Sequence, residues 1–223
     1  MKRRLLAIYD RLLEAQGHQA WWPCRTPFEV CVGAILTQNT AWTNVEKALR
    51  ELRRRRLLSY DALRRLPVSR VAPLIRSSGF FNVKARRLSA FVAFLGREYG
   101  GRIARMRHEL PAVLRAKLLA VPGIGPETAD SIALYAAGQP LFVVDAYTRR
   151  VFERLGFLSG RESYDAVQAL FMDALPADAA LFNDYHAQVV RLAKDACRTK
   201  PRCGRCTLAD LCSFTRSAPR PAA

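Results

Sequence analysis

The stretch Leu118-Leu-Ala-Val-Pro-Gly-Ile-Gly-Pro-Glu-Thr-Ala-Asp130 places a glycine-rich turn between two apolar segments. An apolar helix is predicted to end before the turn, and Pro126 stands where proline favours the start of the next helix. Gly123 and Gly125 let the backbone approach a ligand closely, and the free N–H groups of the following helix attract an anion. Such a turn is also typical of an ordinary helix–helix connection. Its apolar flanks favour a clamp that binds phosphate without reading sequence.

Apolar residues on both sides of this motif repeat with the 3.6-residue period of an α-helix. One such face comprises Phe28, Cys31, Val32, Ile35 and Leu36, and another comprises Val151, Phe152 and Leu155. Alternating runs flanked by hairpin turns, which would indicate strands, are missing. The sequence therefore predicts an all-α protein.

The charge of the chain indicates a polyanionic partner. Lys and Arg number 36 against 19 Asp and Glu, which gives a formal net charge of +17. Phosphate contacts supply most of the non-specific affinity of proteins for nucleic acids, so this balance favours DNA or RNA as the partner. A basic surface without a function is the alternative.

The cellular compartment is predicted from what the sequence lacks. Asp10 and Arg11 interrupt the N-terminal apolar run too early for a signal peptide. No segment offers the roughly 20 apolar residues of a membrane span. Four of the six cysteines crowd near the C-terminus, unlike a secreted disulfide framework. We therefore expect a cytoplasmic, nucleoid-associated protein that contacts no membrane.

The glycine-rich motif is followed by Gly138-Gln139-Pro140 and then by Val143-Val144-Asp145. Together these segments resemble the helix-hairpin-helix, the Gly/Pro-rich loop and the aspartate of the endonuclease III superfamily of DNA glycosylases. The resemblance extends over residues 28–212, most of the chain. It implies a two-lobed, all-α fold with a helical bundle at residues 20–135, a second lobe at residues 1–19 plus 136–216, and a disordered tail at residues 217–223.

Asp145 matches the catalytic aspartate of that superfamily. Its local sequence alone favours a helix N-cap, because it directly precedes a helical segment. The resemblance implies instead a carboxylate beside the sugar, where cleavage of an N-glycosidic bond develops positive charge. There it would stabilise the charge or activate a water molecule.

Four cysteines, Cys197, Cys203, Cys206 and Cys212, form a short-spaced set near the C-terminus. Four thiolates at such spacing bind either zinc or a [4Fe-4S] cluster. The set resembles the iron-sulfur loop of the superfamily, although its first interval is one residue shorter. The resemblance implies a structural cluster that stiffens a basic loop, whose residues Arg198, Lys200, Arg202 and Arg205 would contact DNA phosphates.

Glu127 occupies the hairpin position at which bifunctional members carry the lysine of the strand-cleaving (AP-lyase) reaction. A glutamate cannot form a Schiff base with the sugar. We therefore expect a monofunctional glycosylase with little or no lyase activity.

Several further segments resemble the endonuclease III-like 3-methyladenine DNA glycosylases, which carry the same glutamate but lack the cysteine loop. These are Trp21-Trp22-Pro23, Phe28-Glu29, Leu36-Thr-Gln-Asn-Thr40 and Ser78-Gly79-Phe80 with Asn82, beside the Gly-Ile-Gly-x-Glu of the hairpin. The resemblance implies that Trp22 and Trp42 stack on a flipped base and that Trp21 supports them. Gln38 would fill the gap left in the duplex, and Gln188 replaces a pocket lysine.

The predicted function is base excision repair, with an alkylated purine such as 3-methyladenine as the substrate. Such bases are cationic, and an indole face attracts a cation by about 0.5–2 kcal/mol. The predicted partner is double-stranded DNA that contains a damaged base. It would be bound by a monomer through Gln38, Gly123, Gly125, Thr128 and the basic loop.

Two alternatives remain open. Within the same enzyme class, the substrate would be uracil, mismatched thymine or an oxidised pyrimidine. In a different class, the chain would be a non-catalytic DNA-binding iron-sulfur protein.

Overall fold

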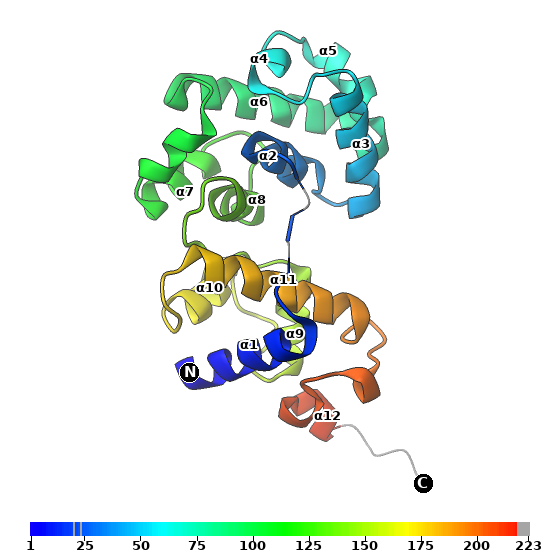
Figure 1. The fold of residues 1–223 in the computed structure, drawn as a ribbon, viewed down its shortest axis with the longest axis vertical. Helices are drawn as coiled ribbons and strands as arrows, with labels where there is room; N and C mark the ends of the chain where they lie inside the picture. Colours follow the sequence, from blue (N-terminus) through cyan, green and yellow to red (C-terminus); the bar gives the residue numbers. More distant parts are fainter. Residues whose placement is uncertain (20, 23, 218–223) are drawn as a thin grey trace. The chain divides into compact units, whose positions relative to one another are not determined.

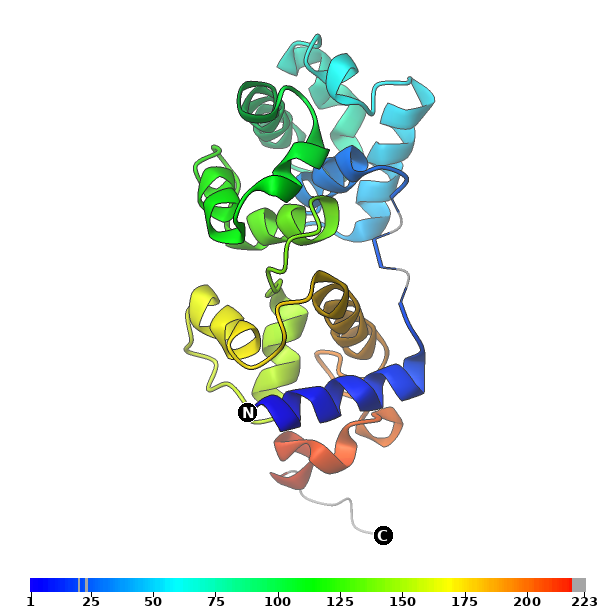
Figure 2. The same cartoon turned by 60° about the vertical axis from the view of Figure 1, so that its left-hand side comes forward.

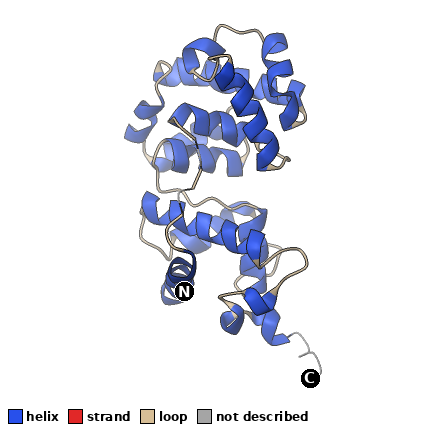
Figure 3. Ribbon diagram, turned by 45° about the vertical axis from the view of Figure 1, so that its right-hand side comes forward, coloured by secondary structure: helices blue, strands red, loops and turns tan. Residues whose placement is uncertain are grey.

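The computed structural model describes residues 1–19, 21–22 and 24–217. Within these residues the regular elements are all helical, which confirms the predicted all-α class (Figure 3). None of the described helices is long and apolar enough to cross a membrane. Residues 218–223 of the predicted tail lie outside the described residues, whereas Ser217 ends a short helix.

The chain divides into two compact units. A central unit spans residues 22–139, and a terminal unit combines residues 1–21 with residues 140–223.

The central unit is a group of packed helices (Figure 1). Its elements are α2 (Pro27–Leu36), α3 (Trp42–Arg54), α4 (Tyr60–Leu63), α5 (Val68–Val71), η1 (Ala72–Ser78), α6 (Phe81–Tyr99), η2 (Ile103–His108), α7 (Pro111–Leu119), α8 (Pro126–Ser131) and the π-helix η3 (Ile132–Ala136).

The core of the central unit is built on α2. Thr26 caps this helix by accepting a hydrogen bond from the Glu29 N–H, and Pro27 supplies the fixed backbone angle that suits a first turn. Every residue from Phe28 to Leu36 is buried, because α3, α6, α8 and η3 all pack on the helix. Its near-continuous apolar sequence is therefore that of a core helix rather than a surface helix.

The predicted hairpin is formed by α7 and α8. The turn between them requires glycine at position 123, where φ is +85° and a Cβ would stand 2.4 Å from the Cγ of Arg87. Pro126 opens α8 as predicted. Gly125 has an ordinary extended conformation and open space beside its Cα, so a close approach to the backbone is possible there.

The terminal unit contains α1 (Lys2–Gln16), α9 (Ala146–Arg154), α10 (Tyr164–Met172), α11 (Ala179–Asp195), η4 (Cys203–Arg205), η5 (Ala209–Leu211) and α12 (Ser213–Ser217). Within it, α11 packs against both α1 and α9 (Figure 2).

An aromatic cluster holds these helices together. Phe142 stacks on Phe171 of α10 at a centroid distance of 3.9 Å and meets the edges of Phe182 and Tyr185 of α11. Burial of each ring stabilises the unit by about 1.5–3 kcal/mol. Phe142 lies three residues before Asp145, so this packing fixes the position of the segment that carries Asp145.

Candidate functional site

Asp145 is the N-cap of α9. Its Oδ1 accepts a hydrogen bond from the Thr148 N–H at 2.7 Å, which leaves Oδ2 outside the cap. The side chain is 16 % exposed, and Oδ2 lies 3.6 Å from Nε2 of His186, which is buried on α11. A helix N-cap and a catalytic carboxylate are therefore compatible roles for Asp145, because the cap uses Oδ1 and leaves Oδ2 outside it.

The environment of Asp145 favours its ionised form. Burial alone would raise the pKa of this carboxyl, but the charge of His186 and the hydrogen bond from the Thr148 N–H hold it below its usual value. Asp145 is thus a carboxylate at neutral pH, as a residue that stabilises positive charge on a sugar must be.

Trp21 belongs to the same surroundings. Its indole meets the His186 ring edge-on, with centroids 6.1 Å apart, and the Lys194 ammonium lies 5.5 Å above the indole ring. Trp21 therefore packs against His186, and the Lys194 ammonium already occupies one face of the Trp21 indole.

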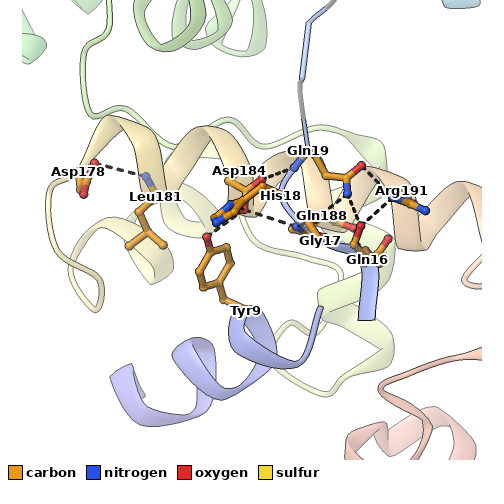
Figure 4. Close-up of polar contacts among 10 residues, drawn as sticks. All are labelled: Tyr9, Gln16, Gly17, His18, Gln19, Asp178, Leu181, Asp184, Gln188 and Arg191. Carbon is orange, nitrogen blue, oxygen red and sulfur yellow. Dashed lines mark hydrogen bonds and ion pairs between the residues drawn. The ribbon is translucent and has the colours of Figure 1, made fainter. Parts of the chain in front are cut away.

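The segment that leads to Trp21 is anchored on α11 by Asp184 (Figure 4). The Asp184 carboxylate accepts hydrogen bonds from the Tyr9 hydroxyl at 2.9 Å and from the Gln19 N–H at 2.8 Å, and it contacts Nδ1 of His18 at 3.1 Å. Gln188 is fully buried and donates to the Gly17 carbonyl at 2.6 Å. Its amide therefore fixes this segment.

Trp22 and Trp42 make their contacts within the central unit, apart from those of Trp21. The two rings meet at 73° with centroids 5.5 Å apart. Gly33 leaves room for them, since a Cβ there would stand 3.3 Å from the Trp22 indole nitrogen. Tyr135 completes the group, because its ring lies 5.0 Å from that of Trp22.

Tyr135 is a candidate residue that the sequence reasoning missed. It belongs to η3, a π-helical turn directly after the hairpin helix, and is only partly buried there, unlike its neighbours in that turn. Single π-helical turns inside helices frequently mark functional sites. In the sequence, Tyr135 is marked only by being the one aromatic residue in the mostly small-residue stretch Ser131-Ile-Ala-Leu-Tyr-Ala-Ala-Gly138.

Gln38 is bound to the hairpin. Its Nε2 donates to the Gly123 carbonyl at 3.0 Å and to the Thr128 hydroxyl at 2.9 Å, and its Oε1 accepts from Arg87 at 2.5 Å. Thr128 is 7 % exposed, so its hydroxyl supports Gln38. The exposed Glu127 lies in the first turn of α8, where an acidic residue suits the helix dipole.

A buried lysine supports the loop that carries Gln38. Lys84 of α6 is 1 % exposed and donates to the carbonyls of Leu36 at 2.8 Å and Ser78 at 2.6 Å. Burial, together with the charge of Arg87, lowers the pKa of Lys84 to about 8. Nearby, Phe80 is 70 % exposed and adopts a left-handed φ of 45°, which is a strained conformation for this residue.

The four cysteines of the C-terminal set occupy one loop of the terminal unit. Burial, and then the charges of Cys197, Cys212 and Cys203, raise the pKa of the Cys206 thiol. Arg154 of α9 donates to Sγ of Cys197 at 3.3 Å. Across the described residues, no three His, Cys, Asp or Glu side chains form an ion-binding group.

Four thiols in one short loop have the donor chemistry of an iron-sulfur site, although this structure does not gather them around a common centre. The predicted phosphate contacts of the loop, Arg198, Lys200, Arg202 and Arg205, are all exposed.

Comparison with known proteins identifies the family. Residues 32–177 match the family described as HhH-GPD superfamily base excision DNA repair proteins. The chain is 43 % identical over 206 residues to MJ1434 of Methanocaldococcus jannaschii, which is named as a candidate DNA repair glycosylase. That match covers 92 % of this chain and 94 % of the relative.

Solved structures show the same fold. A non-covalent endonuclease III–DNA complex has a TM-score of 0.82 at 24 % identity, with 97 % of both chains covered. The H. pylori 3-methyladenine DNA glycosylase bound to 1,N6-ethenoadenine has a TM-score of 0.70 at 28 % identity, with 86 % of this chain and 94 % of that one covered. The chain therefore belongs to the endonuclease III-like, helix-hairpin-helix superfamily of base excision DNA glycosylases.

Proposed function

We propose that the protein is a monofunctional DNA glycosylase that hydrolyses the N-glycosidic bond of a flipped, alkylated purine such as 3-methyladenine. The observation that carries this proposal is the Asp145 carboxylate, which is largely buried and has one oxygen free of its helix cap. Cleavage gives the sugar oxocarbenium character, which a nearby carboxylate stabilises. The same oxygen can accept a proton from the attacking water.

The monofunctional assignment rests on Glu127. A lyase needs an amine that attacks the sugar, and Glu127 supplies none at the hairpin position. Lys84 of the same unit has a lowered pKa, as a nucleophilic lysine would. It is nevertheless fully buried and donates to two backbone carbonyls, so it cannot take over that role.

The substrate assignment rests on Trp22, Trp42 and Tyr135. Their clustered rings offer π-faces to a flat base, and such faces attract a cationic base more than a neutral one. Trp21 adds less to this argument, because Lys194 already lies over its ring. The similarity to the H. pylori 3-methyladenine enzyme supports the same substrate class.

For the DNA contacts, we propose that the hairpin turn at Gly123 and Gly125 binds phosphate and that Gln38 fills the space of the flipped nucleotide. Thr128 supports Gln38 in this scheme. Cys197, Cys203, Cys206 and Cys212 would hold a [4Fe-4S] cluster, with zinc as the alternative. The cluster would stiffen the loop that presents Arg198, Lys200, Arg202 and Arg205 to the DNA.

The test is base release from duplexes that carry 3-methyladenine, uracil, mismatched thymine or an oxidised pyrimidine. We expect 3-methyladenine to be released fastest. Asp145→Asn should slow release by roughly 10²–10⁴-fold without loss of DNA affinity, because asparagine caps a helix as well as aspartate does. Preference for a neutral base would contradict the substrate assignment. Tight DNA binding without release of any base would indicate a non-catalytic protein.

A further inference from the structure

The Asp145 carboxylate and the His186 imidazole form a buried pair that joins the start of α9 to α11. Asp145 Oδ2 lies 3.6 Å from His186 Nε2, and Oδ1 is held by the Thr148 N–H. The His186 residue is 4 % exposed. Burial of an acid and a base side by side costs desolvation energy, and such pairs occur often at functional sites. We therefore consider a functional role for this pair.

His186 is itself held in place from the other side. Trp21 meets its ring edge-on, and Lys194 lies over the Trp21 ring. The chain before Trp21 is fixed to α11 through the Gln19 N–H, which donates to Asp184 (Figure 4). The imidazole therefore sits between a fixed indole and the carboxylate and has little freedom to turn away.

We propose that His186 is a positioning residue for Asp145, which holds Oδ2 toward the reacting sugar and keeps the carboxylate charged in its dry surroundings. This inference rests on the proposed function, in which Asp145 is the reacting carboxylate. His186 acts through Asp145 and does not itself touch the sugar.

Other charged groups near Asp145 are engaged with other partners, so His186 is the charged group that acts on the ionisation of Asp145 directly. On its own helix, the Thr148 N–H contributes one hydrogen bond without charge. Arg149 donates to the Glu162 carbonyl, and Arg150 donates to the Cys197 carbonyl. From α10, Tyr164 engages the Val144 N–H through its hydroxyl. On α11, Asp184 is engaged by Tyr9, His18 and Gln19. Loss of the imidazole would therefore leave the effect of burial, which raises the pKa of Asp145, opposed mainly by the hydrogen bond from the Thr148 N–H.

The test compares single-turnover base release by the wild type, His186→Phe and His186→Gln over the range from about pH 5 to pH 9. Phenylalanine keeps a flat ring against Trp21 but lacks the nitrogen, whereas glutamine keeps an N–H donor without the charge. His108→Gln, a change at an exposed histidine of the central unit, is the matched control. DNA affinity and melting temperature are measured for each variant.

We expect the rate of His186→Phe to fall about tenfold or more at the acidic end and to recover toward the wild-type rate at the alkaline end. His186→Gln should lie between the two, and His108→Gln should match the wild type. A rate reduced equally at every pH would assign His186 a purely structural role and overturn the inference. If His186→Phe fails to fold, the same comparison is made with His186→Gln alone.

The proposed function and the inference about His186 are contradicted by different results. If the wild type releases a base, Asp145→Asn does not, and both His186 variants keep the wild-type pH profile, only the inference about His186 is overturned. If the wild type releases no base, or Asp145→Asn remains active, the proposed function is overturned together with it.

Discussion

The amide Nε2 of Gln38 donates to the Thr128 hydroxyl at 2.9 Å, so the residue proposed to fill the duplex is bound to the second helix of the hairpin. The same amide donates to the Gly123 carbonyl, and Arg87 donates to its oxygen. One polar cluster therefore connects the proposed phosphate clamp to the loop that follows α2.

Gln38→Ala is expected to slow nucleotide flipping by roughly tenfold, because extrusion costs a few kcal/mol that an inserted side chain helps to offset. Thr128→Val is the matched control, since it removes one hydrogen bond, worth about 1 kcal/mol, and leaves Gln38 present. Fluorescence of 2-aminopurine beside the lesion measures the flipping rate. Equal effects of the two changes would show that Gln38 serves only to stabilise the hairpin.

Lys84 predicts a pH-dependent stability. Its folded-state pKa is about 8 against an ordinary value of 10.5, so between these values the unfolded chain binds the additional proton. Stability should therefore rise with pH across this interval, by about 1–3 kcal/mol for this group. The measurement is the difference in unfolding free energy between the wild type and Lys84→Met, by denaturant titration at about pH 7.5 and pH 10. A difference that does not change with pH would contradict the assignment.

The sequence predicted the parts of the site that depend on local chemistry. Gly123 adopts the positive φ expected of a tight turn, Pro126 opens α8, and Asp145 caps α9. Each of these features is determined by residues within a few positions along the chain, which is the range over which capping and turn preferences act. The all-α class followed from periodicity for the same reason.

The rest of the site depends on contacts between distant segments. His186 reaches Asp145 from another helix, and Lys84 satisfies the carbonyls of Leu36 and Ser78 from a third. A charged side chain in the core contradicts the usual preference for exposure, so its position could not be predicted from its type. Trp21 and Trp22 are adjacent in sequence but engage different units, and Trp22 has a left-handed φ of 65° that no sequence rule predicts.

The cysteine loop should give a brown protein when it is prepared without oxygen, with a broad absorbance near about 400 nm. Cys206→Ser should bleach this colour, because one of four thiolate ligands is lost. Cys31→Ser is the control, since Cys31 is buried in α2 of the central unit, outside the loop. A colourless wild type that carries one zinc per chain would establish the zinc alternative.

Borohydride trapping tests the absence of lyase activity. The wild type should give no covalent adduct with lesion-bearing DNA, because the first turn of α8 presents the carboxylate of Glu127 in place of an amine. Glu127→Lys should gain an adduct, since it introduces an amine at the position that the lyase lysine occupies in bifunctional relatives. A wild-type adduct as abundant as that of a bifunctional enzyme would refute the monofunctional assignment.

Substitutions of Trp42 test the proposed substrate class. Its indole N–H donates to Glu46 at 3.0 Å and its ring meets Trp22, so the ring is fixed before any base arrives. Trp42→Ala should raise the barrier to release of 3-methyladenine by roughly 1–3 kcal/mol, the usual contribution of one stacked base. Trp42→Phe should retain more activity, because it keeps a π-face, although it loses the hydrogen bond to Glu46. Glu46→Gln is the control that weakens this hydrogen bond and leaves the ring unchanged. If uracil or thymine glycol is released faster than 3-methyladenine and Trp42→Ala has no effect, the alkylated-purine assignment is wrong, while the proposed role of Asp145 is unaffected.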